Sequence, residues 1–184
     1  MATTASPSPH AHHPAAHSGA HAHSWRDYVP LIALLAVSSL VAAAIYQSYG
    51  PGMNPVRAMH AFMGFFLCVF ALLKLFDLPG FADGFQMYDL LARRSRAYAL
   101  VYPFLELSLG LAYLAFFRPR DVYLATFLLL GFGALGVITA LRRGLDVHCA
   151  CMGNTLKVPL STVALVEDLG MAGMALVMWI RLQV

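Results

Sequence analysis

Two cysteines one residue apart are the side chains in this sequence best suited to chemistry. Residues 148–153 read His-Cys-Ala-Cys-Met-Gly, so Cys149 and Cys151 form a close dithiol. A thiolate attacks disulfides and also binds soft metal ions. The motif therefore predicts either thiol–disulfide exchange or the holding of a metal.

The neighbours of the dithiol suit both chemistries. His148, together with the preceding Arg142 and Arg143, offers the cationic surroundings that favour a thiolate. A disulfide between the two cysteines would close a very small ring, and we expect it to be strained and to exchange readily. The same thiolates suit Cu(I) or Zn(II), with His148, Met152 or Cys68 as further ligands.

The composition places most of the chain in lipid. Hydrophobic residues make up 60% of the 184 residues and charged residues 11%, against about 45–50% and about 25% in a typical soluble domain. The net charge of +3 is small, and the cations lie beside apolar segments rather than in a basic stripe, so nucleic acid is not an expected partner. The expected surroundings are a lipid bilayer.

Five apolar stretches are long enough to cross that bilayer as helices. A crossing takes about 20 apolar residues, and each crossing must be helical because lipid offers no partners to the backbone. We predict spans at 28–46, 55–76, 97–117, 122–141 and 158–180. The expected fold is an all-α integral membrane bundle of five transmembrane helices. Residues 78–96 carry Phe85, Tyr88, Leu91 and Ala92 at helical spacing, which favours a short amphipathic helix at the interface; an ordinary irregular loop is the alternative.

Several polar side chains fall inside these spans, where they are costly and normally face a partner or a cavity. Lys74 and Glu106 lie on different spans, and the simplest arrangement is an ion pair between them, either structural or part of a proton relay. Glu167 and Asp168 are adjacent and point about 100° apart on one helix, so they cannot face one partner equally.

Other residues of the spans have plainer interpretations. His60 and Cys68 lie on loosely the same side of the second span, and packing explains them more simply than catalysis. Cys68 is still a candidate relay for the dithiol. The glycines of the spans suit close helix contacts, although plain packing is the interpretation we favour; they are Gly64, Gly110, Gly131, Gly133, Gly136, Gly170 and Gly173.

The N-terminal 24 residues carry no charge and little to bury, which predicts a disordered tail. Six of the eight histidines lie in it. Neutral imidazole binds zinc, copper and nickel, so the tail is a candidate metal-binding segment beside the simpler interpretation of a solvated tail. The six are His10, His12, His13, His17, His21 and His23.

The distribution of cations predicts the orientation, because cytoplasmic loops are enriched in Lys and Arg. One face carries Arg26, Arg93, Arg94, Arg96, Arg142, Arg143 and Lys157, and the other carries Arg57, Arg118, Arg120 and Arg181. Seven against four places the N-terminus and the dithiol in the cytoplasm of a bacterial-type inner membrane. Thiols are normally kept reduced there, so a reducing role, or electron passage by way of Cys68, stands beside periplasmic oxidation.

Four motifs in order resemble the MauE family of membrane proteins, relatives of DoxX. They are Lys-Leu-Phe-Asp-Leu-Pro-Gly-Phe at 74–81, Pro-Phe-Leu-Glu at 103–106, Leu-Arg-Arg-Gly at 141–144 and Cys-Ala-Cys-Met-Gly at 149–153. The resemblance covers about residues 56–181, and the family's dithiol motif usually reads Cys-Gly-Cys-Phe-Gly. It implies a four-helix domain at 55–182, to which this chain adds a histidine-rich tail at 1–27 and a helix at 28–49.

The resemblance also implies a redox-associated membrane protein. Family members are linked to methylamine utilisation, in maturation of the disulfide-rich small subunit of methylamine dehydrogenase. Carried onto this chain, Cys149 and Cys151 would be the exchanging pair, and Lys74 and Glu106 the polar residues inside the bundle. The expected partner is a thioredoxin-like or glutaredoxin-like protein, or a client that bears disulfides. The competing functions are copper or zinc handling, with the tail as collector, and a passive scaffold for another redox protein.

Overall fold

The computed structural model describes residues 28–48, 54–143 and 160–182. The described chain forms six helices, and it contains no strand. In chain order they are α1 (Val29–Ser48), α2 (Pro55–Phe76), α3 (Leu78–Tyr88), α4 (Arg96–Leu114), α5 (Pro119–Arg142) and α6 (Leu160–Arg181). All except α3 are long and apolar enough to cross a membrane, which confirms the five predicted spans within the described residues.

The helix starts follow from local capping. The side chain of Asn54 accepts a hydrogen bond from the Val56 N–H at 2.9 Å, and Pro55 occupies the first turn of α2, where its missing N–H costs nothing. Asp77 and Ser95 cap α3 and α4 in the same way. The span predicted at 55–76 therefore has the observed bounds.

The turn between α4 and α5 ends the third span earlier than we predicted. Phe116 and Arg118 have φ of 53° and 39°, in the left-handed region that side chains rarely adopt. The helix cannot continue through such residues, so α4 ends at Leu114 rather than at residue 117.

The helix predicted in the 78–96 connection is present but shorter; its place at the membrane interface stays a prediction. α3 buries Phe81, Phe85 and Tyr88 on one face. It ends at Tyr88 because Asp89 leaves the helical conformation, so Leu91 and Ala92 lie in the turn that follows. Of these two, Ala92 is buried and Leu91 is exposed.

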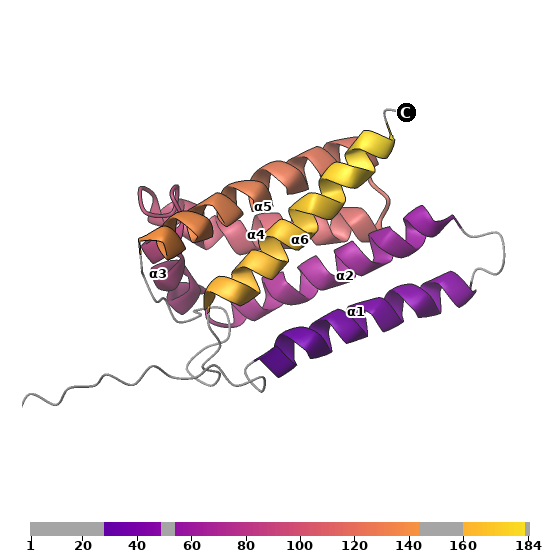
Figure 1. Ribbon diagram of the computed structural model, residues 1–184, viewed down its shortest axis with the longest axis horizontal. Coiled ribbons are helices and arrows are strands. Elements are labelled where there is room, and N and C mark those ends of the chain that lie inside the picture. Colours follow the sequence, from indigo (N-terminus) through magenta and orange to yellow (C-terminus); the bar gives the residue numbers. More distant parts are fainter. Residues whose placement is uncertain (1–27, 49–53, 144–159, 183–184) are drawn as a thin grey trace, which may run out of the picture.

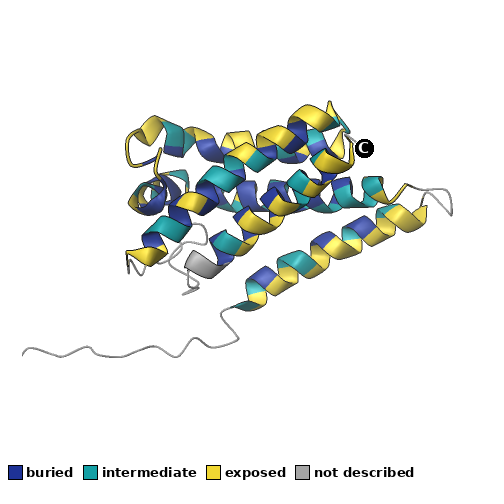
Figure 2. Ribbon diagram, turned by 45° about the horizontal axis from the view of Figure 1, so that its top comes forward, coloured by how far each residue is buried: buried dark blue, intermediate teal, exposed yellow. Residues whose placement is uncertain are grey.

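The long helices run side by side and define two ends of the bundle (Figure 1). α2 packs mainly on α4, and α5 on α6, while α1 packs on α2. α1 buries only Leu31, Ser38 and Ala42, and it lies at the edge of the bundle (Figure 2). We call the "α3 end" the end where α2 and α5 finish and where α4 and α6 begin. The "turn end" is the opposite one, which holds the 115–118 turn.

Close helix contact explains only some of the glycines. A Cβ on Gly110 would lie 2.9 Å from the backbone nitrogen of Cys68, and one on Gly64 would lie 2.8 Å from the Gly110 carbonyl oxygen. These two glycines let α2 and α4 touch. Gly133 and Gly136 are similarly crowded, but Gly131, Gly170 and Gly173 have no neighbour within 4 Å among the described residues, so close helix contact does not explain those three.

Candidate functional site

A buried ion-pair network joins three helices in the half of the bundle nearer the α3 end. Lys74, in the last turn of α2, is 3% exposed. Its Nζ lies 2.6 Å from Oε2 of Glu106 on α4 and 2.6 Å from Oε1 of Glu167 on α6. The predicted pair of Lys74 with Glu106 is therefore present, and Glu167 joins it as a second carboxylate.

Asp168 brings a third carboxyl group beside this network from the same turn of α6. It is 6% exposed and points to α5, because a Cβ on Gly133 would lie 2.9 Å from its Oδ2. The same point lies 3.5 Å from the hydroxyl of Tyr102, which is one turn before Glu106 on α4. Both acidic residues of α6 are thus buried, and they face different neighbours, as their angular separation requires. We call Lys74, Glu106, Glu167 and Asp168 the "charged cluster".

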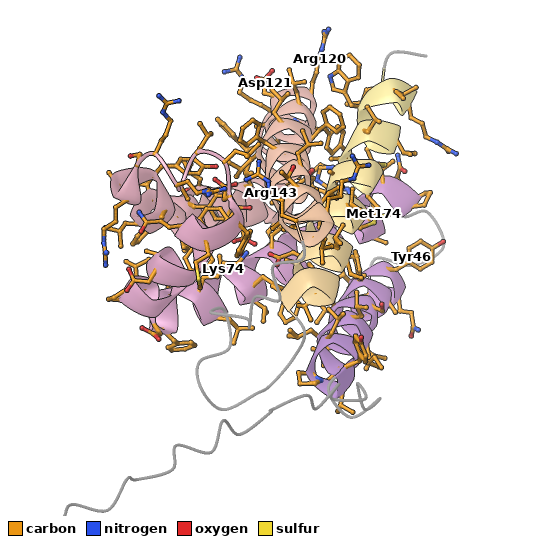
Figure 3. All side chains as sticks on the ribbon, turned by 60° about the vertical axis from the view of Figure 1, so that its left-hand side comes forward. Tyr46, Lys74, Arg120, Asp121, Arg143 and Met174 are labelled. Atoms are coloured by element: carbon orange, nitrogen blue, oxygen red, sulfur yellow. The ribbon has the colours of Figure 1, made fainter. Side chains whose placement is uncertain are left out.

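Aromatic rings enclose the ammonium group of this cluster. Lys74 Nζ lies 5.4 Å from the ring centroid of Tyr102, 5.7 Å from that of Phe70 and 5.9 Å from that of Phe81. Such rings attract a cation through their quadrupole, and they also fill the space that water would need. In Figure 3, Lys74 lies among the helices, whereas Arg120 projects outward from the bundle.

A fourth buried carboxyl group lies in the connection between α3 and α4. Asp89 is 0% exposed, and its Oδ1 accepts hydrogen bonds from the Leu91 and Ala92 N–H groups at 2.9 and 2.7 Å. Its Oδ2 has no hydrogen-bond partner among the described residues and packs beside Gly136. Burial raises the pKa of Asp89 above its usual range, and the two N–H donors oppose that rise. Because Asp89 lies in a connection between helices, it was not among the polar residues predicted within the spans.

His60 and Cys68 lie in different surroundings from the charged cluster. His60 is 1% exposed near the turn end; its Nδ1 faces the Tyr113 carbonyl oxygen at 3.1 Å, and its Nε2 faces the Tyr123 hydroxyl. A neutral ring satisfies both, donating from Nδ1 and accepting at Nε2. Half-buried Cys68 packs against Gly110, one turn beyond Glu106 on α4. His60 thus has a structural explanation, and the relay role of Cys68 stays a prediction.

The predicted exchanging cysteines lie outside the described residues, as do His148 and the six tail histidines. The segment with the two cysteines and His148, residues 144–159, connects α5 to α6 in the sequence, so it is tethered to the α3 end. Five arginines are exposed on the described residues near that end, namely Arg93, Arg94, Arg96, Arg142 and Arg143. Within the described ranges, no group of three or more His, Cys, Asp or Glu residues is arranged to hold a metal ion.

A hollow of about 540 Å³ lies apart from the charged cluster, between α4 and α5. Apolar side chains such as Leu105, Leu109 and Val122 line it, and the exposed ion pair of Arg118 with Asp121 lies at its turn end. It contains none of the predicted site residues.

The fold and this site define a class of protein: a multi-pass membrane bundle with a buried ionic network near one end. The family model described as "Methylamine utilisation protein MauE" matches residues 53–181. The chain therefore belongs to the MauE family, as its motifs predicted. Searches of curated proteins and of solved structures return no match.

Proposed function

We propose that this chain is a membrane thiol–disulfide exchange protein whose reactive groups are Cys149 and Cys151. The observation that carries the proposal is topological. The dithiol segment is tethered to the end of the bundle nearest the charged cluster. Burying these charged groups is costly, and a purely structural core would not need them. Family membership adds an accessory role in methylamine utilisation.

The proposed reaction needs only the two thiols and a partner disulfide. The thiolate of one cysteine attacks a partner sulfur, forming a mixed disulfide while the partner's S–S bond breaks and its other sulfur leaves as a thiolate. The second cysteine then attacks the mixed disulfide, which releases the partner as a dithiol and leaves a Cys149–Cys151 disulfide. Run in reverse, the same steps oxidise a client, as maturation of a disulfide-rich subunit requires.

The proposed location is a bacterial-type inner membrane with the dithiol on the cytoplasmic side. The exposed arginines near the α3 end support this orientation, because positive residues are retained in the cytoplasm. A thioredoxin-like or glutaredoxin-like protein is then the proposed partner. A periplasmic dithiol would instead favour a secreted client.

Alkylation in intact cells tests both the chemistry and the side. Permeant and impermeant thiol reagents are compared on the wild type and on Cys149→Ser, Cys151→Ser and Cys68→Ser. We expect the dithiol to react with the permeant reagent only, and one of the two dithiol variants to accumulate a mixed disulfide with a partner. The proposal fails if the double variant of Cys149 and Cys151 retains full function.

Deletion of residues 1–24 separates this proposal from metal handling. Under thiol exchange, the truncated chain should form the same mixed disulfide as the full chain. Loss of copper or zinc tolerance on truncation, with the mixed disulfide absent in both chains, would support the metal function instead.

A further inference from the structure

The charges of the charged cluster do not cancel. The cluster holds one ammonium group, on Lys74, and three carboxyl groups, and the four residues are exposed by 6% or less. With every group ionised, the cluster would carry a net charge of −2 in the membrane interior. Uncompensated charge is so costly in such surroundings that groups neutralise instead.

The geometry makes full ionisation harder still. Two oxygens that each lie 2.6 Å from the same nitrogen are at most 5.2 Å apart, which is twice that distance, so Glu106 and Glu167 crowd one another. Asp168 is joined to Glu167 by one peptide bond. Carboxylates this close in a medium of low dielectric repel strongly, and such groups typically share protons.

An oxygen of Glu106 without a hydrogen-bond partner indicates that the cluster binds protons. Glu106 is 0% exposed, and its Oε1 has no hydrogen-bond partner among the described residues. An ionised carboxylate only accepts hydrogen bonds, whereas a protonated one also donates. A proton would give the acidic residues the donor that they lack.

The surrounding elements supply no further cation to this site in the described chain. α3 contributes the Phe81 ring and α5 contributes Gly133, while α4 adds the neutral hydroxyl of Tyr102. A further acidic group lies nearby against α5, since Asp89 packs beside Gly136, one turn from Gly133. The surroundings therefore increase the excess of acid.

We propose that the charged cluster is a proton-binding site, holding two protons at neutral pH among the carboxyl groups of Glu106, Glu167 and Asp168. Two protons and the ammonium of Lys74 leave one carboxylate, so the cluster is neutral overall. This inference goes beyond the proposed function and is independent of it, because no thiol takes part.

Infrared spectroscopy of the full chain in lipid nanodiscs tests the proposal, because the carbonyl stretch of a protonated carboxylic acid is separate from that of a carboxylate. The background variant Asp89→Asn removes the fourth buried carboxyl group. At neutral pH we expect a carboxylic-acid band equal to two groups. Glu106→Gln should lower it by one group, and Lys74→Met should raise it by one.

Asp121→Asn is the matched control, because Asp121 is an exposed carboxylate paired with Arg118 at the turn end. Its substitution should leave the band unchanged. The proposal is overturned if the Asp89→Asn chain shows no carboxylic-acid band at neutral pH, a measurement that needs no change in the cluster. It is also overturned if Glu106→Gln, Glu167→Gln and Asp168→Asn, each shown to be helical by circular dichroism, all leave the band unchanged.

Discussion

The same helix carries a buried basic side chain toward each end of the bundle, and the two are satisfied differently. On α2, His60 meets one carbonyl oxygen and one hydroxyl, so its two ring nitrogens are matched one to one. Lys74 meets two carboxyl groups directly, with Asp168 beside them. The contrast shows that burial alone does not distinguish the two sites; what separates them is that the partners of His60 are neutral, whereas the carboxyl groups around Lys74 outnumber its single charge.

The turn end is organised by rings. Phe116 stacks on the His60 ring with centroids 4.0 Å apart, and the Arg57 guanidinium lies 5.1 Å from the Phe116 centroid. Phe116 adopts a left-handed backbone conformation, which costs about 1–3 kcal/mol. The stacking of Phe116 on His60 opposes that cost and holds the α4–α5 turn against α2.

Removing the ammonium of the charged cluster should have the largest effect. We expect Lys74→Met to lower the free energy of unfolding by about 3 kcal/mol at neutral pH, because breaking a buried ion pair costs about 3–5 kcal/mol and the carboxyl groups can take up a proton. The loss should shrink in acid, where neutral carboxyl groups no longer need the cation. Denaturant titration followed by circular dichroism measures it.

Arg143→Met is the control for this experiment, since Arg143 is an exposed cation at the same end. Its effect should stay within about 0.5 kcal/mol. A loss for Lys74→Met that is equal at acid and neutral pH would contradict the charge account of the cluster.

Substitution at the turn end should cost less and leave the cluster untouched. His60→Leu leaves the buried Tyr123 hydroxyl without its partner, so we expect a loss of about 2 kcal/mol. Tyr123→Phe removes only that hydroxyl and should cost about 1 kcal/mol. Neither should change the carboxylic-acid band in the infrared; a change would show that the two ends are coupled.

Gly110 lies between the two sites on α4 and tests what holds them together. A Cβ there would meet the Cys68 backbone, so Gly110→Ala must push α2 away from α4, at a cost of about 1–2 kcal/mol. Gly131→Ala makes the same change in open space and should be neutral or stabilising by up to about 1 kcal/mol. If Gly110→Ala and Gly131→Ala change the thermal stability equally, the close contact of α2 with α4 does not contribute to stability.

Much of the bundle could be predicted because lipid imposes helices of fixed length. The bounds of α2 followed from the length of its apolar stretch, and the pairing of Lys74 with Glu106 followed from the cost of leaving either alone. The early end of α4 could not be predicted, because the composition of the turn does not indicate the positive φ of Phe116.

The other members of the site depend on how the helices are rotated and ordered around the bundle. Glu167 and Asp168 were recognisable as costly residues, but lipid-facing helices are apolar on nearly every side, so the pattern does not say which face points inward. Tyr102 lies one turn before Glu106, and that spacing was the available signal. Asp89 follows α3 directly, and no feature of composition separates it from an ordinary cap.

The smallest predicted effect tests whether Asp89, outside the spans, is also a carboxyl group that folding makes easier to protonate. Burial raises the pKa of this carboxyl group in the folded chain, against the N–H donors of Ala92 and Leu91. The folded state therefore binds the proton more tightly than the unfolded state does. The stability that this gives is fully present below the unfolded pKa of about 3.9 and is lost as the pH rises through the folded pKa.

Asp89→Asn keeps an oxygen that can accept from the two N–H groups but removes the titration. The wild type should therefore lose stability relative to this variant as the pH rises from about 4 toward neutral. Unfolding measured across that range checks it, with Asp83→Asn as the control, since Asp83 is an exposed carboxylate paired with Arg96. Parallel stability curves for the wild type and Asp89→Asn would mean that folding does not raise the pKa of Asp89, and that the protonation proposed for the charged cluster does not extend to this carboxyl group.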